Sequence, residues 1–193
     1  MIYKELLSAA AIVLTIIAFY PYIRSILQGK TKPHVFSWII WGSTTFVVFL
    51  AQLADKGGAG AWPIGISGII TIYVALLAYL KKSDNRITRI DWGFFLLAMT
   101  SLPLWYITSD PLWAVVVLTM VDVIGFGPTF RKAFFYPFEE LLTLFVIITA
   151  RNLISIAALE NYSLTTVLFP ASIAAVSALF ILMVAYRRRI MTG

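Results

Sequence analysis

Two ionisable side chains, Asp122 and Arg151, lie inside long apolar segments of the sequence. Charged groups at membrane depth are costly, and they commonly mark a pathway for a solute, a proton or an ion. A guanidinium can also hold a carboxylate through two parallel hydrogen bonds. Three interpretations follow: Asp122 couples proton movement, Arg151 binds an anionic group of a solute, or the two form a structural ion pair.

Polar and aromatic neighbours extend this candidate site. In the apolar segment 35–54, Trp41 lies one helical turn deeper than Trp38. We expect Trp38 in the aromatic belt at the membrane surface and Trp41 in a central site, where its ring can stack on a planar or sugar-like solute. The residues expected to line that site are Trp41, Thr44, Thr45, Asp122, Arg151 and Asn152.

The composition is that of a membrane protein. Hydrophobic residues make up 61% of the chain and charged residues 12%, with a mean hydropathy of +0.90, whereas about 25% of an ordinary soluble domain is charged. The chain has no cysteine, one histidine, no phosphate-binding glycine loop and no His-Glu-x-x-His pair. We therefore expect no metal, no cofactor and no enzymatic activity. The positive charges lie in short clusters between apolar runs, which indicates contact with a lipid bilayer and not with nucleic acid.

Seven apolar segments approach the roughly 20 residues that a membrane-spanning helix needs. They are 5–28, 35–54, 61–80, 91–108, 112–133, 138–158 and 164–186. If they cross the membrane in alternation, twelve of the 15 Lys and Arg residues fall on one side, which is then cytoplasmic. The sequence thus predicts an all-α integral membrane protein with seven transmembrane helices in a bacterial inner membrane. Its N-terminus is expected outside and its C-terminus in the cytoplasm.

Two stretches of the chain, 107 positions apart (128 minus 21), look alike. Phe19-Tyr20-Pro21-Tyr22-Ile23-Arg24 matches Phe126-Gly127-Pro128-Thr129-Phe130-Arg131, and Trp62-Pro63 matches Phe169-Pro170 at the same offset. We therefore expect residues 1–83 and 111–193 to be copies of one three-helix unit, joined by a linker helix in 84–110. A single linker helix gives both units the same orientation, so the arrangement is a 3+1+3 parallel repeat, a signature of transporters.

The same offset relates the polar residues of the candidate site. It pairs Thr15 with Asp122, Thr44 with Arg151, and Thr45 with Asn152. Polar side chains therefore recur at matching places, but the charged members occur in the second copy alone. This asymmetry suits one asymmetric solute, or a single proton site per protein.

Prolines and charges near the cytoplasmic ends suggest moving parts. Pro21 and Pro128 lie within apolar segments, where proline removes a helical hydrogen bond, so each is either a hinge or a static kink. Glu139 and Glu140 begin the segment 138–158, where they either cap the helix through its dipole or pair with Arg131 or Lys132 as a cytoplasmic gate.

Gly127-Pro128-Thr129-Phe130-Arg131-Lys132 resembles the proline motif of the SWEET and PQ-loop transporter superfamily, and Pro21-Tyr22-Ile23-Arg24 resembles its other copy. The resemblance implies a divergent bacterial seven-helix member with the same 3+1+3 arrangement and with prolines that act as hinges. The chain departs from the family in having Pro-Tyr and Pro-Thr in place of Pro-Gln. It also lacks the asparagines that line the sugar site in the third helix of each SWEET unit.

These features predict a membrane transporter that moves a small polar solute by alternating access between two three-helix repeats, either proton-coupled or as a uniporter. The solute would bind near the membrane midplane between the repeats. The alternative is a non-transporting seven-helix membrane protein on the same fold, such as a receptor, a lipid-binding protein or an assembly factor. The sequence sets neither the identity of the solute nor the oligomeric state.

Overall fold

The computed structural model describes residues 2–29, 33, 35–81, 87–139 and 142–192, apart from the side chains of Asp91, Pro128, Arg131, Lys132, Glu139 and Thr192. Every regular element in these ranges is helical. The α-helices are α1 (Ile2–Leu27), α2 (Val35–Ala54), α3 (Trp62–Leu80), α4 (Arg89–Met99), α5 (Ser101–Thr108), α6 (Pro111–Gly125), α7 (Gly127–Phe135), α8 (Leu142–Ala157) and α9 (Leu164–Thr192). Two short 3₁₀ turns, η1 (Gly58–Ala61) and η2 (Pro137–Glu139), precede α3 and α8.

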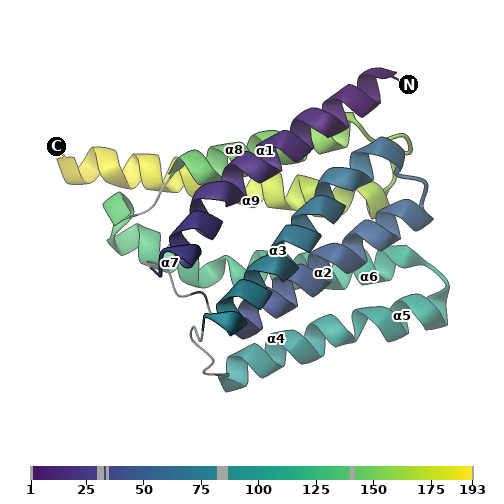
Figure 1. The fold of residues 1–193 in the computed structure, drawn as a ribbon, viewed down its shortest axis with the longest axis horizontal. Coiled ribbons are helices and arrows are strands. Elements are labelled where there is room, and N and C mark those ends of the chain that lie inside the picture. Colours follow the sequence, from purple (N-terminus) through teal and green to yellow (C-terminus); the bar gives the residue numbers. More distant parts are fainter. Residues whose placement is uncertain (1, 30–32, 34, 82–86, 140–141, 193) are drawn as a thin grey trace.

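Six of the helices form two layers that face each other (Figure 1). One layer holds α1, α3 and α2 in that order, and the other holds α8, α9 and α6. Helices α1 and α8 pack together along one edge of the pair of layers, and α2 and α6 pack along the opposite edge. We call these edges the α1–α8 seam and the α2–α6 seam. The α4–α5 segment packs outside the α2–α6 seam.

Small residues let α2 and α3 approach closely within their layer. A Cβ atom added at Gly42 would lie 2.9 Å from the backbone nitrogen of Ile72, and one added at Gly68 would lie 3.0 Å from that of Phe46. Close backbone contact through glycine is the usual way to pack helices in a membrane, because lipid supplies no hydrophobic force between them. These glycines therefore let α2 and α3 pack as a close pair within the first layer.

The surface and interior have the polarity expected of a membrane protein. Val13, Ile16 and Ile17, in the middle of α1, are each about half exposed, whereas Thr15 between them is buried. Among the described residues, four helical stretches are long and apolar enough to cross a membrane: Ile2–Leu27, Val35–Ala54, Gly58–Leu80 and Leu164–Met191. Shorter apolar helices cover Trp92–Thr108, Pro111–Gly125 and Leu142–Ala157. The coarse prediction of an all-α protein with membrane-length apolar helices is confirmed, while the count of seven spans stays a prediction.

Two of the seven expected segments are each divided into two helices. Segment 91–108 is split at Thr100 between α4 and α5, and segment 112–133 is split at Phe126 between α6 and α7. Proline follows each break within three residues, at Pro103 and Pro128, and its missing N–H removes one helical hydrogen bond there. By contrast, α1 continues unbroken through Pro21.

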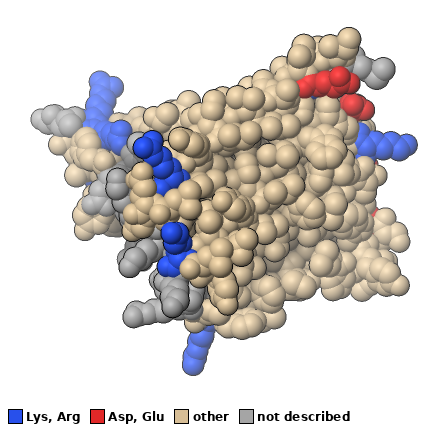
Figure 2. Space-filling model, viewed as in Figure 1, with Lys and Arg blue, Asp and Glu red and all other residues tan. Residues whose placement is uncertain are grey.

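Positively and negatively charged side chains gather mainly at opposite ends of the bundle (Figure 2). At the end where α1 begins, called here the N-terminal end, Glu5 lies in the first turn of α1, and Asp55 and Glu160 lie in loops. At the other end, called the basic end, α1 finishes with Arg24 and α9 with Arg189 in its last turn. In Figure 2 the blue side chains gather mainly at the basic end and the red ones at the N-terminal end.

The apolar core is joined across the layers at one end and divided at the other. Near the N-terminal end, one cluster combines residues of both layers: Val48, Phe49, Ala51, Ala61, Ile64, Val115, Leu118, Phe169 and Ile173. Toward the basic end, each layer has a cluster of its own. The first consists of Ile26, Val74 and Leu77, and the second of Ala133, Phe145, Phe180 and Val184.

Candidate functional site

Asp122 lies in α6 and faces α2 across the α2–α6 seam. Helix α6 is fixed at its start by Asp110, whose side chain accepts a hydrogen bond from the Leu112 N–H at 2.9 Å, and by Pro111 in the first turn. Asp122 is 9% exposed, three turns further along. The Thr44 hydroxyl of α2 lies 3.3 Å from Asp122 Oδ1 and 3.0 Å from the Trp41 carbonyl oxygen, so its proton has an acceptor on either side.

Arg151 lies in α8 and faces α1 across the opposite seam. Its side chain is 7% exposed, and Nη1 donates to Thr15 Oγ1 at 3.3 Å. Thr15 can accept this bond because its own hydroxyl proton goes to the Ala11 carbonyl oxygen, 2.8 Å away. Asp122 and Arg151 therefore have different hydroxyl partners on different seams. The ion pair between them, one of the three interpretations, is not formed between these two described side chains.

Several buried polar atoms near these contacts have no hydrogen-bond partner. They are Arg151 Nε, Asn152 Oδ1 and Thr119 Oγ1. Asn152 uses its amide nitrogen on the Ile148 carbonyl oxygen at 2.8 Å, which leaves its oxygen as a spare acceptor. Thr119 precedes Asp122 by one turn of α6. Unpaired polar groups are costly where neither water nor protein reaches them, so the middle of the bundle has hydrogen-bonding capacity that its own side chains leave unused.

The two hydroxyl contacts occupy matching places in the sequence. Thr15 and Asp122 differ by 107 positions, and so do Thr44 and Arg151. The contact between Asp122 and Thr44 thus has a counterpart, at the offset that separates the two similar proline motifs, in the contact between Thr15 and Arg151. In both cases the first helix of one layer meets the second helix of the other.

Trp41 lies one turn closer to the basic end than Thr44 and borders the same seam. It is 38% exposed, and its ring lies at an edge-on angle to Trp38, with 5.7 Å between centroids. A Cβ atom at Gly125 would lie 3.5 Å from Trp41 Nε1, which places the indole against α6 one turn beyond Asp122. Thr45, the remaining candidate of α2, is buried.

The proposed hinges and gate are described only in part. Pro21 lies inside α1 and Pro128 in the first turn of α7, directly after the break at Phe126. The side chains of Pro128, Arg131 and Glu139, and all of Glu140, lie outside the described residues.

At the N-terminal end, hydrogen bonds join the loop that follows α2 to the loop that follows α8. Asn161 Nδ2 donates to the Asp55 carbonyl oxygen at 2.8 Å, and the Ser163 hydroxyl donates to the Asp55 carboxylate. The Glu160 backbone N–H donates to the Gly57 carbonyl oxygen at 3.0 Å. We call this set of bonds the loop–loop contact. It ties the two layers together above the shared apolar cluster.

At this end, two prolines have no N–H for the carbonyl four residues earlier in the chain. A side chain donates a hydrogen bond to each of these carbonyls. Pro170 of α9 has no N–H for the carbonyl of Thr166, four residues earlier, and Gln52 Nε2 of α2 donates to that oxygen at 2.7 Å. Pro63 likewise has no N–H for the Ala59 carbonyl, which accepts from the Trp62 N–H and, at 2.6 Å, from the Ser8 hydroxyl of α1. Gln52 therefore links the layers, while Ser8 links α1 to η1.

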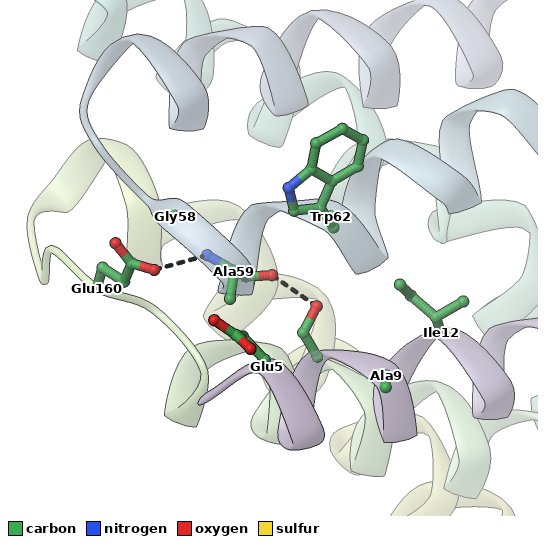
Figure 3. A pocket seen from close by; sticks show the side chains of 8 residues that line it. Glu5, Ala9, Ile12, Gly58, Ala59, Trp62 and Glu160 are labelled. Carbon is green, nitrogen blue, oxygen red and sulfur yellow. Dashed lines mark hydrogen bonds between the residues drawn. The ribbon is translucent and has the colours of Figure 1, made fainter. Parts of the chain in front are cut away.

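An open groove of about 440 Å³ lies beside the loop–loop contact (Figure 3). Glu160 points toward Ala59 in Figure 3, and its Oε1 accepts from the Ala59 N–H at 3.4 Å. A second cavity of about 60 Å³ lies between α2, α6 and the α4–α5 segment and is lined in part by Thr44. Within the described ranges, no three His, Asp or Glu side chains come together to hold a metal ion.

Sequence reasoning overlooked several residues that these contacts make prominent. Thr15 was noted only as the position matching Asp122, yet its hydroxyl is the partner of Arg151. Gln52 has a readable signal, since a polar residue in an apolar helix needs a partner and Pro170 leaves an acceptor free. The loop–loop contact has no comparable signal, because nothing in the sequence pairs Asp55 with Ser163.

No protein-family model matches the chain, and neither a curated protein nor a solved structure matches it.

Proposed function

We propose that this protein carries a small polar solute across the membrane by alternating access between its two layers. The observation that carries the proposal is the pair of cross-layer contacts in the middle of the bundle, in which one buried carboxylate and one buried guanidinium each face a hydroxyl of the other layer. Ionisable groups at this depth are expensive, and they commonly mark a pathway for a solute or an ion. The partnerless atoms of Arg151 and Asn152 lie beside them and offer further hydrogen bonds to a solute.

The layers correspond to the units expected from the repeat. Residues 1–83 contribute α1, α2 and α3, residues 111–193 contribute α6 to α9, and residues 84–110 contain the linker α4–α5. The matching positions of the two hydroxyl contacts support duplication. This architecture agrees with the resemblance to the SWEET and PQ-loop superfamily, and we propose membership on that basis together with seven membrane crossings.

We propose that the N-terminal end faces outside and the basic end faces the cytoplasm, because Lys and Arg gather mainly at the basic end. In this orientation, the shared cluster and the loop–loop contact close the outer half, while the divided clusters leave the layers separable on the cytoplasmic side. A carrier needs both arrangements in turn, since solute enters through one side and leaves through the other. The break at Phe126, two residues before Pro128, gives α7 a place to pivot relative to α6, and Pro21 in α1 is the position that matches Pro128.

Uptake into proteoliposomes of purified protein tests the proposal. Sugars, amino acids, vitamins and nucleosides are screened as radiolabelled solutes, with and without a proton gradient. We expect one class to accumulate, and we expect Asp122→Asn and Arg151→Ala each to abolish its uptake. Gly93→Ala is the matched control, since a Cβ at Gly93 meets nothing within 4 Å.

Two outcomes contradict parts of this proposal. Undiminished uptake in both variants would reject the site while leaving a carrier. Uptake of no solute class by correctly folded protein would reject the carrier, and would favour the receptor, lipid-binding or assembly role on the same fold.

A further inference from the structure

The two buried charges of the candidate site lie on opposite edges of the paired layers. Asp122 belongs to the α2–α6 seam, and Arg151 belongs to the α1–α8 seam. Figure 1 shows these seams on either side of α3 and α9, which occupy the middle of their layers. A cation recognised by Asp122 and an anion recognised by Arg151 would therefore bind at opposite edges of the paired layers.

Neither charge is neutralised by a charged partner among the contacts described above. Asp122 has one hydroxyl neighbour, and Arg151 donates to one hydroxyl through Nη1 while its Nε has no partner. Both side chains are more than nine-tenths buried. A buried charge without a counter-charge is strongly destabilising, and the arrangement that would relieve it, an Asp122–Arg151 pair, is prevented by their positions on different seams.

The spare hydrogen-bonding atoms have the polarity that two charged ligand groups need. On the α1–α8 seam, Arg151 Nε is a spare donor, so a carboxylate can bridge Nε and an Nη atom of the guanidinium in the bidentate manner. On the α2–α6 seam, the Asp122 carboxylate and Thr119 Oγ1, one turn apart in α6, are acceptors suited to an ammonium group.

We propose that the transported solute is an elongated zwitterion, with its ammonium group at Asp122 and its carboxylate at Arg151. This inference rests on the proposed function and adds the chemical class of the substrate. Packed helices have axes about 8–10 Å apart, and α3 and α9 separate the two seams, so the ligand charges are separated by a chain of several bonds. An ω-amino acid has this form. A neutral sugar leaves both protein charges unpaired, and glycine is too short to reach both.

Thermal stabilisation of the purified, detergent-solubilised protein tests this class, because a ligand that binds the folded state raises the melting temperature. The probes are glycine, 4-aminobutanoate and 6-aminohexanoate, with hexanoate and hexylamine as analogues that carry one charge and glucose as a neutral solute. We expect 6-aminohexanoate to bind at least about tenfold more tightly than either one-charge analogue, since each analogue leaves one buried charge unpaired.

Charge-removing variants should change the preference in opposite directions. Asp122→Asn should remove the advantage of 6-aminohexanoate over hexanoate, and Arg151→Gln should remove its advantage over hexylamine. Gly93→Ala should retain the full preference. If a variant does not fold, the comparison of analogues on the unmodified protein still decides the question.

The results separate this inference from the function on which it rests. The zwitterion proposal would be overturned, and the carrier retained, by tight binding and uptake of a neutral solute. In that case each of the two charge-removing variants would alter the affinity for the neutral solute by less than about threefold. Equal binding of 6-aminohexanoate and a one-charge analogue would overturn it as well. The absence of both binding and uptake for every solute class would overturn the carrier and the inference together.

Discussion

The two ends of the bundle are built differently, although the same helices run through both. At the N-terminal end, one apolar cluster draws residues from both layers, and hydrogen bonds join Asp55 to Asn161 and Ser163. At the basic end, each layer closes around its own cluster. The candidate site lies where the shared packing gives way to separate packing. The two layers are therefore joined firmly on one side of the candidate site only.

This asymmetry has an energetic meaning for a carrier. Lipid is as apolar as leucine, so packing contacts and hydrogen bonds, and not the hydrophobic effect, hold the layers together in a membrane. Opening the N-terminal end breaks the loop–loop contact and the shared packing, and only new contacts at the basic end can offset that loss. Predictions that disturb one end and spare the other therefore test whether the difference governs transport.

The largest effect is expected from locking the N-terminal end. In the double variant Asp55→Cys/Ser163→Cys, the two side chains already in contact are replaced by thiols in a chain that otherwise has no cysteine. Oxidation should link the loops and reduce uptake by more than about tenfold, because a carrier that cannot open one side cannot complete its cycle. Uptake in proteoliposomes is measured before and after oxidation.

The single-cysteine variants and reversal by a reductant are the controls for this lock. Full uptake by the crosslinked protein would contradict alternating access through the N-terminal end. Loss of uptake that a reductant does not reverse would point to damage and not to locking.

A second prediction concerns a substitution at the N-terminal end that creates a steric clash between the layers. Gly60 lies under the end of α8, where an added Cβ would meet the Ser155 carbonyl oxygen at 2.6 Å and the Leu159 Cα at 2.7 Å. Gly60→Ala should lower the free energy of unfolding by about 1–3 kcal/mol, because backbone atoms cannot yield as side chains do. Denaturation in mixed micelles gives the value.

The matched variant for this comparison is Gly93→Ala, in α4, where the new methyl group meets nothing within 4 Å. It should be no less stable than the unmodified protein, because alanine favours a helix over glycine. Equal stability of the two variants would show that the layers are less tightly joined at the N-terminal end than the contacts indicate.

Sequence patterns predict helices better than they predict which atoms meet. Apolar length locates the membrane-length helices, and the structure begins α2 at Val35 and ends it at Ala54, the limits of the expected segment. The splits at Thr100 and Phe126 are harder to foresee, because proline both kinks and ends helices. The class of residue at the candidate site is readable, since Asp122 and Arg151 are charges in apolar runs.

The partners of these charges depend on which helices become neighbours. Rise along a helix places Arg151 near the depth of Asp122, and that reasoning admits an ion pair. In the structure the two residues instead face different seams. Asp122 contacts Thr44, and Arg151 contacts Thr15. The depth of a residue in the membrane can be counted along its own helix. The seam that it faces depends on how the helices pack and cannot be counted from the sequence.

A third prediction concerns the carbonyl that Pro170 leaves free. Gln52→Leu removes the donor to Thr166 and leaves a buried oxygen unpaired, so stability should fall by about 1–3 kcal/mol. In the background Pro170→Ala, residue 170 regains an N–H that can bond to the same oxygen, and Gln52→Leu should then cost less. A double-mutant cycle of unfolding free energies measures this coupling.

Ser177→Ala provides the comparison for Gln52, because the Ser177 hydroxyl is buried without any partner to lose. It should change stability by less than about 0.5 kcal/mol. A cycle with no coupling between positions 52 and 170 would contradict the assignment of Gln52 as the replacement donor.

The smallest effects are expected at the site itself, from Thr15→Val and Thr44→Val. Each variant keeps the shape of the side chain and removes the hydroxyl that faces Arg151 or Asp122. Measured hydrogen bonds between membrane helices average roughly 0.6 kcal/mol, so each variant should lose about 1 kcal/mol or less of stability. Because the two contacts lie at matching positions, the two losses should agree closely.

Ligand binding should distinguish the two variants. Thr15→Val should alter the affinity for the carboxylate end of a solute, and Thr44→Val should alter the affinity for its ammonium end. Equal changes for both ends in both variants would mean that the seams do not act as distinct halves of one site.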